Sequence, residues 1–375
     1  MNEAEILNAM ALAQMLRFQP NVLMQLFRQL GSASAIVEHR NHLSDVLPEA
    51  TSRLSEALSG YEEALRRAQD ELTFCRQHAI RVLVAGSEDY PQRLAECDDA
   101  PLVLYYRGTA NLNCQRVICV VGTRHCTAYG QDVVRRFMED LRNLCPDVLI
   151  VSGLAYGIDI NAHRQALQQG MLTVGVLAHG LDDLYPPRHR QTAIEMLSQG
   201  GLLTEFMTHT NADKVNFVRR NRIVAGMSDA CVVVESAARG GALITAELSR
   251  SYFRETFAFP GRVGDDYSEG CNNLIRDNGA VLITGAADLV AAMRWHTTEE
   301  IEKAQADGIE RQLFPSLSAD EQTVVDALRH ENDQALNLLA QRVGMPIAQL
   351  SSTLFGLEMK GVVKRLAGGV QHLLS

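Results

Sequence analysis

The sequence has no hydrophobic run long enough to cross a membrane. A membrane-spanning helix needs about 20 consecutive apolar residues, and the apolar runs of this chain are much shorter. The first residues, Met1 to Glu5, also lack the basic segment with which a signal peptide begins. We therefore expect a cytoplasmic protein that does not insert into a membrane.

Closely spaced cysteine pairs, which would hold a metal, are also absent. The chain has 8 cysteines, and no two of them form a Cys-x-x-Cys pair. Several lie within apolar stretches, as is typical of buried thiols in a reducing compartment. We expect neither a structural metal nor a cofactor.

Positive charge is in the minority, which makes its clustering informative. The chain has 35 Lys and Arg against 45 Asp and Glu, a formal net charge of -10 at pH 7. Nevertheless, Lys214 and the run from Phe217 to Arg222 place four cations and one aromatic ring within nine residues. Guanidinium groups beside an exposed aromatic ring suit phosphates and stacked bases. The cluster predicts that the ligand is a polyanion.

A short charged run usually means no more than a solvated surface, and this alternative stays open for the cluster. Two observations favour a binding site. No acidic residue occurs between Asp213 and Asp229, so the positive potential is not neutralised locally. The run also opens a predicted helix, whose N-terminus adds partial positive charge.

The middle of the chain, from about residue 80 to 292, alternates short β-branched runs with helical patterns. The runs are continuously apolar, as in parallel strands that helices cover on both faces. We therefore predict an α/β fold with an extended Rossmann-like, doubly wound parallel sheet, in which ligands bind beyond the carboxyl ends of the strands. The predicted strands are residues 116–121, 148–151, 173–177, 201–204, 231–234 and 280–283.

Three predicted strand-to-helix turns are candidate sites in such a sheet. The first is Gly122-Thr123-Arg124, which brings a cation to the crevice. The second runs from Ser152 to Asp159, and its glycines, Gly153 and Gly157, would let backbone amides cradle a phosphate at a helix N-terminus. The pattern is neither GxGxxG nor Walker, so nucleotide hydrolysis is not implied. The alternative is that these glycines only permit a tight turn.

The third turn and a later loop complete the predicted site. The third turn, from Glu235 to Ala242, carries Arg239 before two glycines. The loop, at residues 260–262 and 268–275, is rich in turn residues and includes Asn272. We predict that this loop forms part of the wall of the site.

Taken together, the motifs resemble those of the DNA processing protein A family, also called DprA or Smf, over roughly residues 80 to 292. Each motif is weak alone, but six in order are specific. They are Gly122-Thr123-Arg124, Ser152 to Asp159 followed by His163, Leu181-Asp182 with Tyr185-Pro186, Phe217-x-x-Arg220-Asn221-Arg222, Gly240 to Ala246, and Gly270-x-Asn272-x-Leu274-Ile275.

This resemblance implies a function and partners. Members of the family bind single-stranded DNA without sequence specificity, usually as homodimers. They protect incoming DNA and help to load the RecA recombinase during natural transformation and homologous recombination. No enzymatic reaction is implied.

Carried over residue by residue, the resemblance also implies a binding site. Arg124, Ser152 and Gly153 would line a phosphate pocket, Phe217 would stack on a base, and Asn221 would fix the loop or donate to a phosphate. Lys214 with Arg220 or Arg222 would complete the positive wall. The full predicted set is Arg124, Ser152, Gly153, Gly157, Lys214, Phe217, Arg219, Arg220, Asn221, Arg222, Arg239 and Asn272.

An alternative function is a nucleotide-processing Rossmann enzyme similar to the lysine-decarboxylase-like phosphoribohydrolases. Asp159 and His163, four residues apart on a predicted helix, could form a catalytic or metal pair, but no third ligand is evident. Glu205 and Glu235 follow strands and could act as general acid or base. However, the Pro-Gly-Gly-x-Gly-Thr pattern that the enzyme class would need at its glycine-rich turn is absent.

The segments before and after the core, which we place at residues 76–295, are predicted to form small helical domains. Residues 1–75 predict short amphipathic helices similar to a sterile-alpha-motif or helix-hairpin-helix region, with an accessory or interaction role. An acidic linker is expected at 296–315. Residues 316–375 predict a winged helix. Its third helix offers only Lys360 and Glu358 as charges, so a protein contact is favoured over DNA.

Overall fold

The computed structural model describes residues 1–40, 52–298, 317–360, 362–365 and 370–373. The chain divides into two compact units, Met1–Thr298 and Glu299–Ser375. The linker predicted at residues 296–315 lies almost entirely outside the described residues. Each unit is considered by itself.

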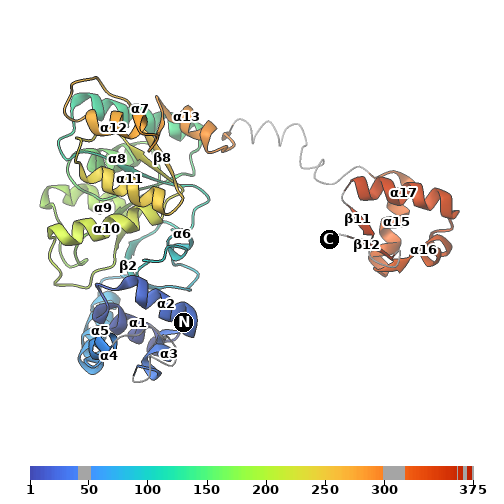
Figure 1. The fold of residues 1–375 in the computed structure, drawn as a ribbon, viewed down its shortest axis with the longest axis horizontal. Coiled ribbons are helices and arrows are strands. Elements are labelled where there is room, and N and C mark those ends of the chain that lie inside the picture. Colours follow the sequence, from blue (N-terminus) through green and yellow to red (C-terminus); the bar gives the residue numbers. More distant parts are fainter. Residues whose placement is uncertain (41–51, 299–316, 361, 366–369, 374–375) are drawn as a thin grey trace. The chain divides into compact units, whose positions relative to one another are not determined.

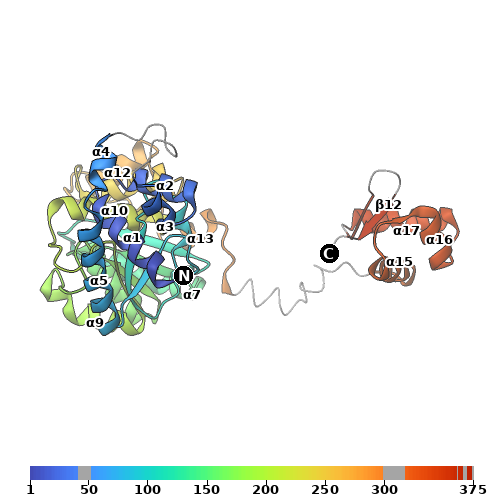
Figure 2. The same ribbon diagram turned by 90° about the horizontal axis from the view of Figure 1, so that it is seen from below.

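The first unit begins with five helices, which are shown in blue in Figures 1 and 2. Asn2 caps the first helix, because its side chain accepts a hydrogen bond from the Glu5 amide. Buried residues of these helices, such as Leu12 and Leu72, belong to the same apolar core as Leu83 of the sheet. The helices therefore share a core with the sheet. They are α1 (Glu3–Met15), α2 (Pro20–Leu30), α3 (Ala33–Glu38), α4 (Ser52–Ala57) and α5 (Tyr61–Gln77).

A nine-stranded sheet forms the centre of this unit, in the order β1-β2-β6-β5-β4-β3-β7-β8-β9. The seven strands from β6 to β9 in this order are parallel to one another, whereas β2 pairs antiparallel with both β6 and β1. The predicted doubly wound α/β fold is confirmed. The strands are β1 (Arg81–Val84), β2 (Val103–Gly108), β3 (Val117–Val121), β4 (Leu149–Ser152), β5 (Thr173–Val176), β6 (Gly200–Thr204), β7 (Ala230–Val233), β8 (Glu255–Ala258) and β9 (Val281–Leu282).

Helices cover both faces of the sheet, which explains why the strands lack alternation. Within β3, Ile118 and Val120 belong to the core under one layer of helices, whereas Cys119 and Val121 belong to the other core. One layer contains α7 (Ala128–Leu144), α8 (Ile158–Gln168), α9 (Arg190–Ser198) and α13 (Ala286–Ala292). The other contains α10 (Lys214–Gly226) and α11 (Gly241–Ser251). The unit also has α6 (Gln92–Ala95) and α12 (Glu269–Arg276).

Strand β3 marks the point at which the chain reverses its direction across the sheet. It lies between β4 and β7, and the loops that leave β3 and β7 lead to α7 and α11, on opposite faces. The two loops meet, because the Thr123 amide donates to the Glu235 carbonyl at 2.7 Å. Ligands of doubly wound sheets bind at this kind of switch point.

The second unit is a winged helix, as predicted. Leu328, Leu339, Leu354 and Leu357 belong to its own core. It contains α15 (Ala319–His330), β10 (Gln334–Ala335), α16 (Leu336–Val343), α17 (Ile347–Met359), β11 (Val363–Arg365) and β12 (Val370–Leu373).

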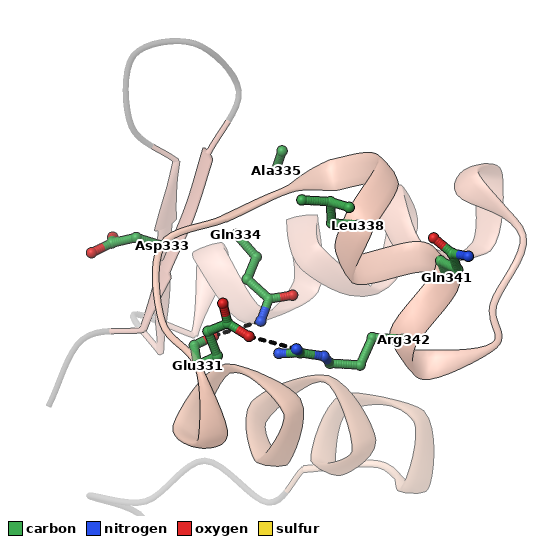
Figure 3. Close-up of a pocket in the computed structure, with 7 residues that line it drawn as sticks. All are labelled: Glu331, Asp333, Gln334, Ala335, Leu338, Gln341 and Arg342. Atoms are coloured by element: carbon green, nitrogen blue, oxygen red, sulfur yellow. Dashed lines mark hydrogen bonds and ion pairs between the residues drawn. The ribbon is translucent and has the colours of Figure 1, made fainter.

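A polar hollow opens on this winged helix (Figure 3). Glu331 pairs with Arg342 at 2.5 Å, and the Gln334 side chain donates to the Glu331 carbonyl at 2.8 Å. Asp333 adds a second carboxylate to the lining, against the single cation Arg342. Such a lining is unsuited to a phosphate, because its acids outnumber its cations.

Two further features can be excluded for the described part of the chain. None of the described helices combines the length and the apolar character that a membrane span needs. Among the same residues, no cluster of three or more His, Cys, Asp or Glu side chains could hold a metal ion.

Candidate nucleic-acid interface

The cationic run identified in the sequence, Lys214 to Arg222, lies in the first nine residues of the 13-residue helix α10, which follows β6. Asp213 caps this helix by accepting a hydrogen bond from the Asn216 amide at 2.7 Å. Lys214 is exposed and Phe217 is half-buried, whereas Arg220 and Ile223 are buried. The helical period therefore divides the run into an outward face and an inward face.

Arg220 points into the protein, which corrects the expectation that it faces a phosphate. Its side chain is 4% exposed and donates to the carbonyl oxygens of Gly153, at 2.6 Å, and Val176. Burial lowers the pKa of the guanidinium to about 10, and the Asp159 carboxylate opposes this shift. Arg220 thus remains charged at neutral pH. Through these two hydrogen bonds it links α10 to the carboxyl ends of β4 and β5.

Arg222 is also part of the framework. It donates to Glu205 at 2.5 Å and to the Asp99 carbonyl at 2.7 Å, and it is buried. Glu205, the candidate general base, is thereby engaged in an ion pair. Arg219 lies 3.5 Å from the same carboxylate, and its guanidinium lies over the rings of Phe18 and Phe206.

The turn after β4 is built differently from the predicted phosphate cradle. The Asp159 carboxylate accepts hydrogen bonds from the Gly153 amide at 3.2 Å and the Ala155 amide at 3.4 Å. The buried Ser152 hydroxyl donates to the Val120 carbonyl at 2.6 Å. The Gly153 amide and the Ser152 hydroxyl, which were expected to face a ligand, therefore form hydrogen bonds within the protein.

The glycines of this turn serve close packing. A Cβ atom at Gly153 would overlap the Arg220 guanidinium, and one at Gly157 would overlap the Thr123 carbonyl. Gly157 also has a positive φ of 78°, which favours glycine. The tight-turn alternative thus fits both glycines, and Gly157 also lines an open hollow.

A cluster of exposed and half-buried side chains lies at the carboxyl ends of the parallel strands. The Arg124 guanidinium lies 4.8 Å from the centre of the Phe217 ring, and the centre of the Tyr185 ring lies 5.9 Å from it in an edge-to-face arrangement. Lys214 stands one helical turn before Phe217, on the same face. Neither Arg124 nor Lys214 forms an ion pair with any residue that the structure describes. We call Arg124, Tyr185, Lys214 and Phe217 the Phe217 surface.

A hollow adjoins the Phe217 surface. It has no acidic residue in its lining, which suits an anion, and it lies where α7 and α8 begin. The amino ends of the two helices add partial positive charge there. The lining residues are Arg124, His125, Cys126, Gln131, Tyr156, Gly157 and Asn161.

The other predicted site residues have separate roles. Arg239 is exposed in the loop after β7. Asn272 exchanges two hydrogen bonds of 3.1 Å with the Gly261 backbone and so fixes the predicted wall loop. Asn221 accepts a hydrogen bond at 3.2 Å from Arg220, its neighbour in α10, so the loop-fixing and phosphate-donating roles considered for it stay predictions.

Tyr185, Tyr156 and His125 border the site but were absent from the predicted set. Each lies in a loop that follows a strand, and Tyr185 belongs to a quoted motif. The available signal for Tyr185, which is 44% exposed, was a tyrosine beside a proline in the loop that follows β5. His125 directly follows the predicted Arg124, and its ring stacks on Tyr267 at 6.0 Å.

The remaining candidate catalytic groups are buried within the fold. Glu235 accepts hydrogen bonds from the Thr127 amide at 3.0 Å and from the Thr127 hydroxyl at 2.5 Å. The fully buried His163 places Nδ1 2.7 Å from the Thr173 hydroxyl. Burial raises the pKa of Asp159 and lowers that of His163 to about 3.

We expect His163 to make the protein acid-sensitive. Above the unfolded pKa of about 6.5, the ring is neutral in both states and costs nothing. As the pH falls toward 3, the unfolded chain binds a proton that the folded protein does not, so the free energy of unfolding falls. The slope from this group approaches about 1.4 kcal/mol per pH unit.

Urea unfolding of wild type and His163→Gln between pH 7 and pH 4 measures this contribution. The stability of the variant should fall less steeply, because Gln does not titrate. Parallel pH profiles for the two proteins would show that His163 is not the sensitive group.

Comparisons with known proteins add an independent finding. The model of the family described as DNA recombination-mediator protein A matches residues 81–294, and the DprA winged helix domain matches residues 310–369. Protein Smf of Escherichia coli is 32% identical over 90% of this chain and 89% of its own length. A putative DNA processing protein DprA of Mycobacterium tuberculosis is 34% identical over 82% of this chain and 80% of its own length.

Two solved structures are similar as well. DNA processing protein A from Streptococcus pneumoniae matches with a TM-score of 0.58 and 30% identity, over 74% of this chain and 97% of that chain. DNA processing protein A from Helicobacter pylori, whose structure concerns its single-stranded DNA binding mode, matches with a TM-score of 0.52 and 26% identity. It covers 57% of this chain and 95% of that chain.

Proposed function

The chain belongs to the DNA recombination-mediator protein A family, and on that premise we propose that it binds single-stranded DNA at the Phe217 surface. The observation that carries this proposal is the meeting of Arg124, Lys214 and Phe217 at the carboxyl ends of the strands. Arg124 comes from the loop after β3, whereas Lys214 and Phe217 come from α10, and the cations lack carboxylate partners among the described residues. The Helicobacter pylori relative supports the choice of ligand.

The chemistry of the surface suits a ligand without a fixed sequence. Arg124 and Lys214 would neutralise phosphates, which every nucleotide carries. Phe217, with Tyr185 beside it, would stack on a base. Since all bases have an aromatic face, these contacts distinguish single strands from duplexes but not one sequence from another.

We also propose that the protein acts without catalysis. Glu235 and Glu205, which would have served as acid or base, are held by Thr127 and Arg222. Asp159 bonds to loop amides, and His163 is sealed in the core. The side chains considered for the phosphoribohydrolase alternative are thus all engaged within the fold.

The family further suggests a role in recombination. We propose a cytoplasmic homodimer that protects incoming DNA in natural transformation and loads RecA on it. RecA filament growth should speed up when this protein is added to strands coated with single-strand binding protein. Light scattering should give twice the mass of the 41.3 kDa chain. Unchanged filament growth would rule out RecA loading, and a monomeric mass would rule out the homodimer.

Labelled oligothymidylate, compared with a duplex of the same length by fluorescence anisotropy, tests the proposed function. The single strand should bind more tightly at every salt concentration, because only its bases are free to stack. An absence of binding at low salt would discard the function.

Replacing Phe217 by Ala should weaken binding of oligothymidylate by about 1–3 kcal/mol, the usual contribution of one stacked base. The salt dependence should stay nearly unchanged, because stacking releases no counterion. Phe253→Ala is a suitable control, because this ring is 97% exposed and precedes β8. It therefore lies at the amino ends of the parallel strands, whereas the Phe217 surface lies at their carboxyl ends. A changed salt slope with unchanged affinity at low salt would contradict stacking at Phe217.

A further inference from the structure

We propose that Arg17, Phe18 and Arg219 form a second base-stacking site for single-stranded DNA, which we call the Phe18 site. This inference rests on the proposed function and extends it to the N-terminal helices. It gives this part of the chain a direct contact with the ligand, where the sequence predicted only an accessory or interaction role.

Phe18 is unusual because an aromatic ring stands exposed between two cations. It lies in the short connection between α1 and α2, and 66% of its surface is exposed. The Arg17 guanidinium lies 4.7 Å from the ring centre, and that of Arg219 lies 5.2 Å from it. A base with its neighbouring phosphates requires this combination of one ring and two positive charges.

The Phe18 site continues the outward face of α10. Arg219 follows Phe217 by two residues, about 200° around the helix axis, so the two side chains lie at opposite margins of the exposed face of α10. Between them, Val215 and Val218 are exposed. The resulting strip runs from the Phe217 surface to the Phe18 site, and it offers apolar contact and positive charge along its length.

The electrostatic surroundings favour an anion at this position. Glu205 is the carboxylate nearest to Arg219, at 3.5 Å, but it is buried and shared with Arg222 at 2.5 Å. Arg17 forms no ion pair with the described residues and is exposed. The two guanidiniums therefore retain positive potential at the surface, where a phosphate would release counterions.

A purely structural role for Phe18 accounts for less of this geometry. Arg219 does tie the segments together, because it donates a hydrogen bond to the Arg17 carbonyl and lies 5.4 Å from the Phe206 ring. However, a ring that served as a staple would be buried against its neighbours. Phe206 is buried in this way, whereas Phe18 is not.

A tryptophan probe tests for direct contact. The chain has one tryptophan, Trp295, so Phe18→Trp adds a second fluorophore at the proposed site. We expect titration with oligothymidylate of about 20 nucleotides to quench its emission, because bases stack on the indole. Phe253→Trp, at the amino ends of the parallel strands, should show only the response of wild type. Equal responses of the two variants would overturn the proposal.

The dependence on oligonucleotide length gives an independent test. A strand of about 4 nucleotides can occupy only one of the two sites, whereas about 20 nucleotides span both. Phe18→Ala should therefore weaken binding of the long strand by about 5- to 100-fold and leave that of the short strand unchanged. Unchanged binding of the long strand, or an equal loss for both lengths, would refute the Phe18 site.

The two proposals fail in different ways. If the proposed function is wrong, wild type does not bind oligothymidylate of any length. If only the Phe18 site is wrong, wild type binds and Phe217→Ala weakens binding, whereas Phe18→Ala binds both lengths as wild type does.

Discussion

Arg220→Ala should lower the free energy of unfolding by about 3–5 kcal/mol, the usual cost of leaving a buried charge without its partner. The change removes the cation beside Asp159 and the two hydrogen bonds to the Gly153 and Val176 carbonyls. It also empties the space above Gly153, which the guanidinium fills. Urea unfolding followed by circular dichroism measures the loss.

Controls separate this effect from a general effect of losing an arginine. Arg136→Ala removes a side chain that is 69% exposed and paired with Asp132 at the surface, so it should change stability by less than about 0.5 kcal/mol. Combining Arg220→Ala with Asp159→Asn should recover part of the loss, because no buried charge then remains unpaired. If Arg220→Ala were as stable as wild type but no longer bound DNA, Arg220 would have to be assigned to the binding site.

Arg124→Ala combined with Lys214→Ala should weaken binding of single-stranded DNA by roughly two orders of magnitude, since each charged hydrogen bond contributes about 1.5 kcal/mol or more. The plot of log affinity against log salt should become shallower by about 1.4, because two phosphate contacts are lost. Anisotropy titrations at several salt concentrations measure both quantities. Stability should be unaffected, because both side chains are exposed.

The matched control is Arg136→Ala combined with Arg276→Ala. These side chains are 69% and 68% exposed, and their removal changes the net charge by the same amount. We expect the control to bind nearly as wild type does. An equal loss in both double variants would mean that overall charge, not the Phe217 surface, determines binding.

Helix α10 illustrates how far the sequence could predict the site. The run of cations correctly marked the helix, but composition could not tell which cations face solvent. A signal was present, since Arg220 precedes Ile223 and Val224 by three and four residues and so lies on their apolar stripe. Lys214 lies off that stripe, whereas Phe217, seven residues before Val224, lies at its margin. The helical period, extended back from the apolar residues at the end of α10, would have separated the inward-facing cations of the run from the outward-facing ones.

The turn after β4 shows a limit of a different kind. Its glycines predicted open backbone amides, and the same motif contains the carboxylate that occupies two of them, Asp159. Nothing in the spacing tells whether an amide binds a ligand or a side chain of its own loop. The outcome depends on Arg220 of α10, whose positive charge favours the ionised form of Asp159.

The sheet was predictable where strands are buried on both faces. β3, β4, β5, β6 and β7 appear within one residue or two of their predicted positions. β8 was missed, because Glu255 and Thr256 interrupt its apolar pattern, whereas β9, a two-residue edge strand that is half exposed, falls within the strand predicted at residues 280–283. The Phe18 contact could not be predicted, since it joins residues 17 and 18 to residue 219 through the fold.

Photo-cross-linking of wild type to an oligonucleotide that carries 5-iododeoxyuridine tests the central claim most directly. After proteolysis and mass spectrometry, cross-links should fall on the peptide that contains Phe217, and Arg124→Ala combined with Lys214→Ala should abolish them. Cross-links confined to the winged helix, with none on α10, would contradict single-strand binding at the Phe217 surface.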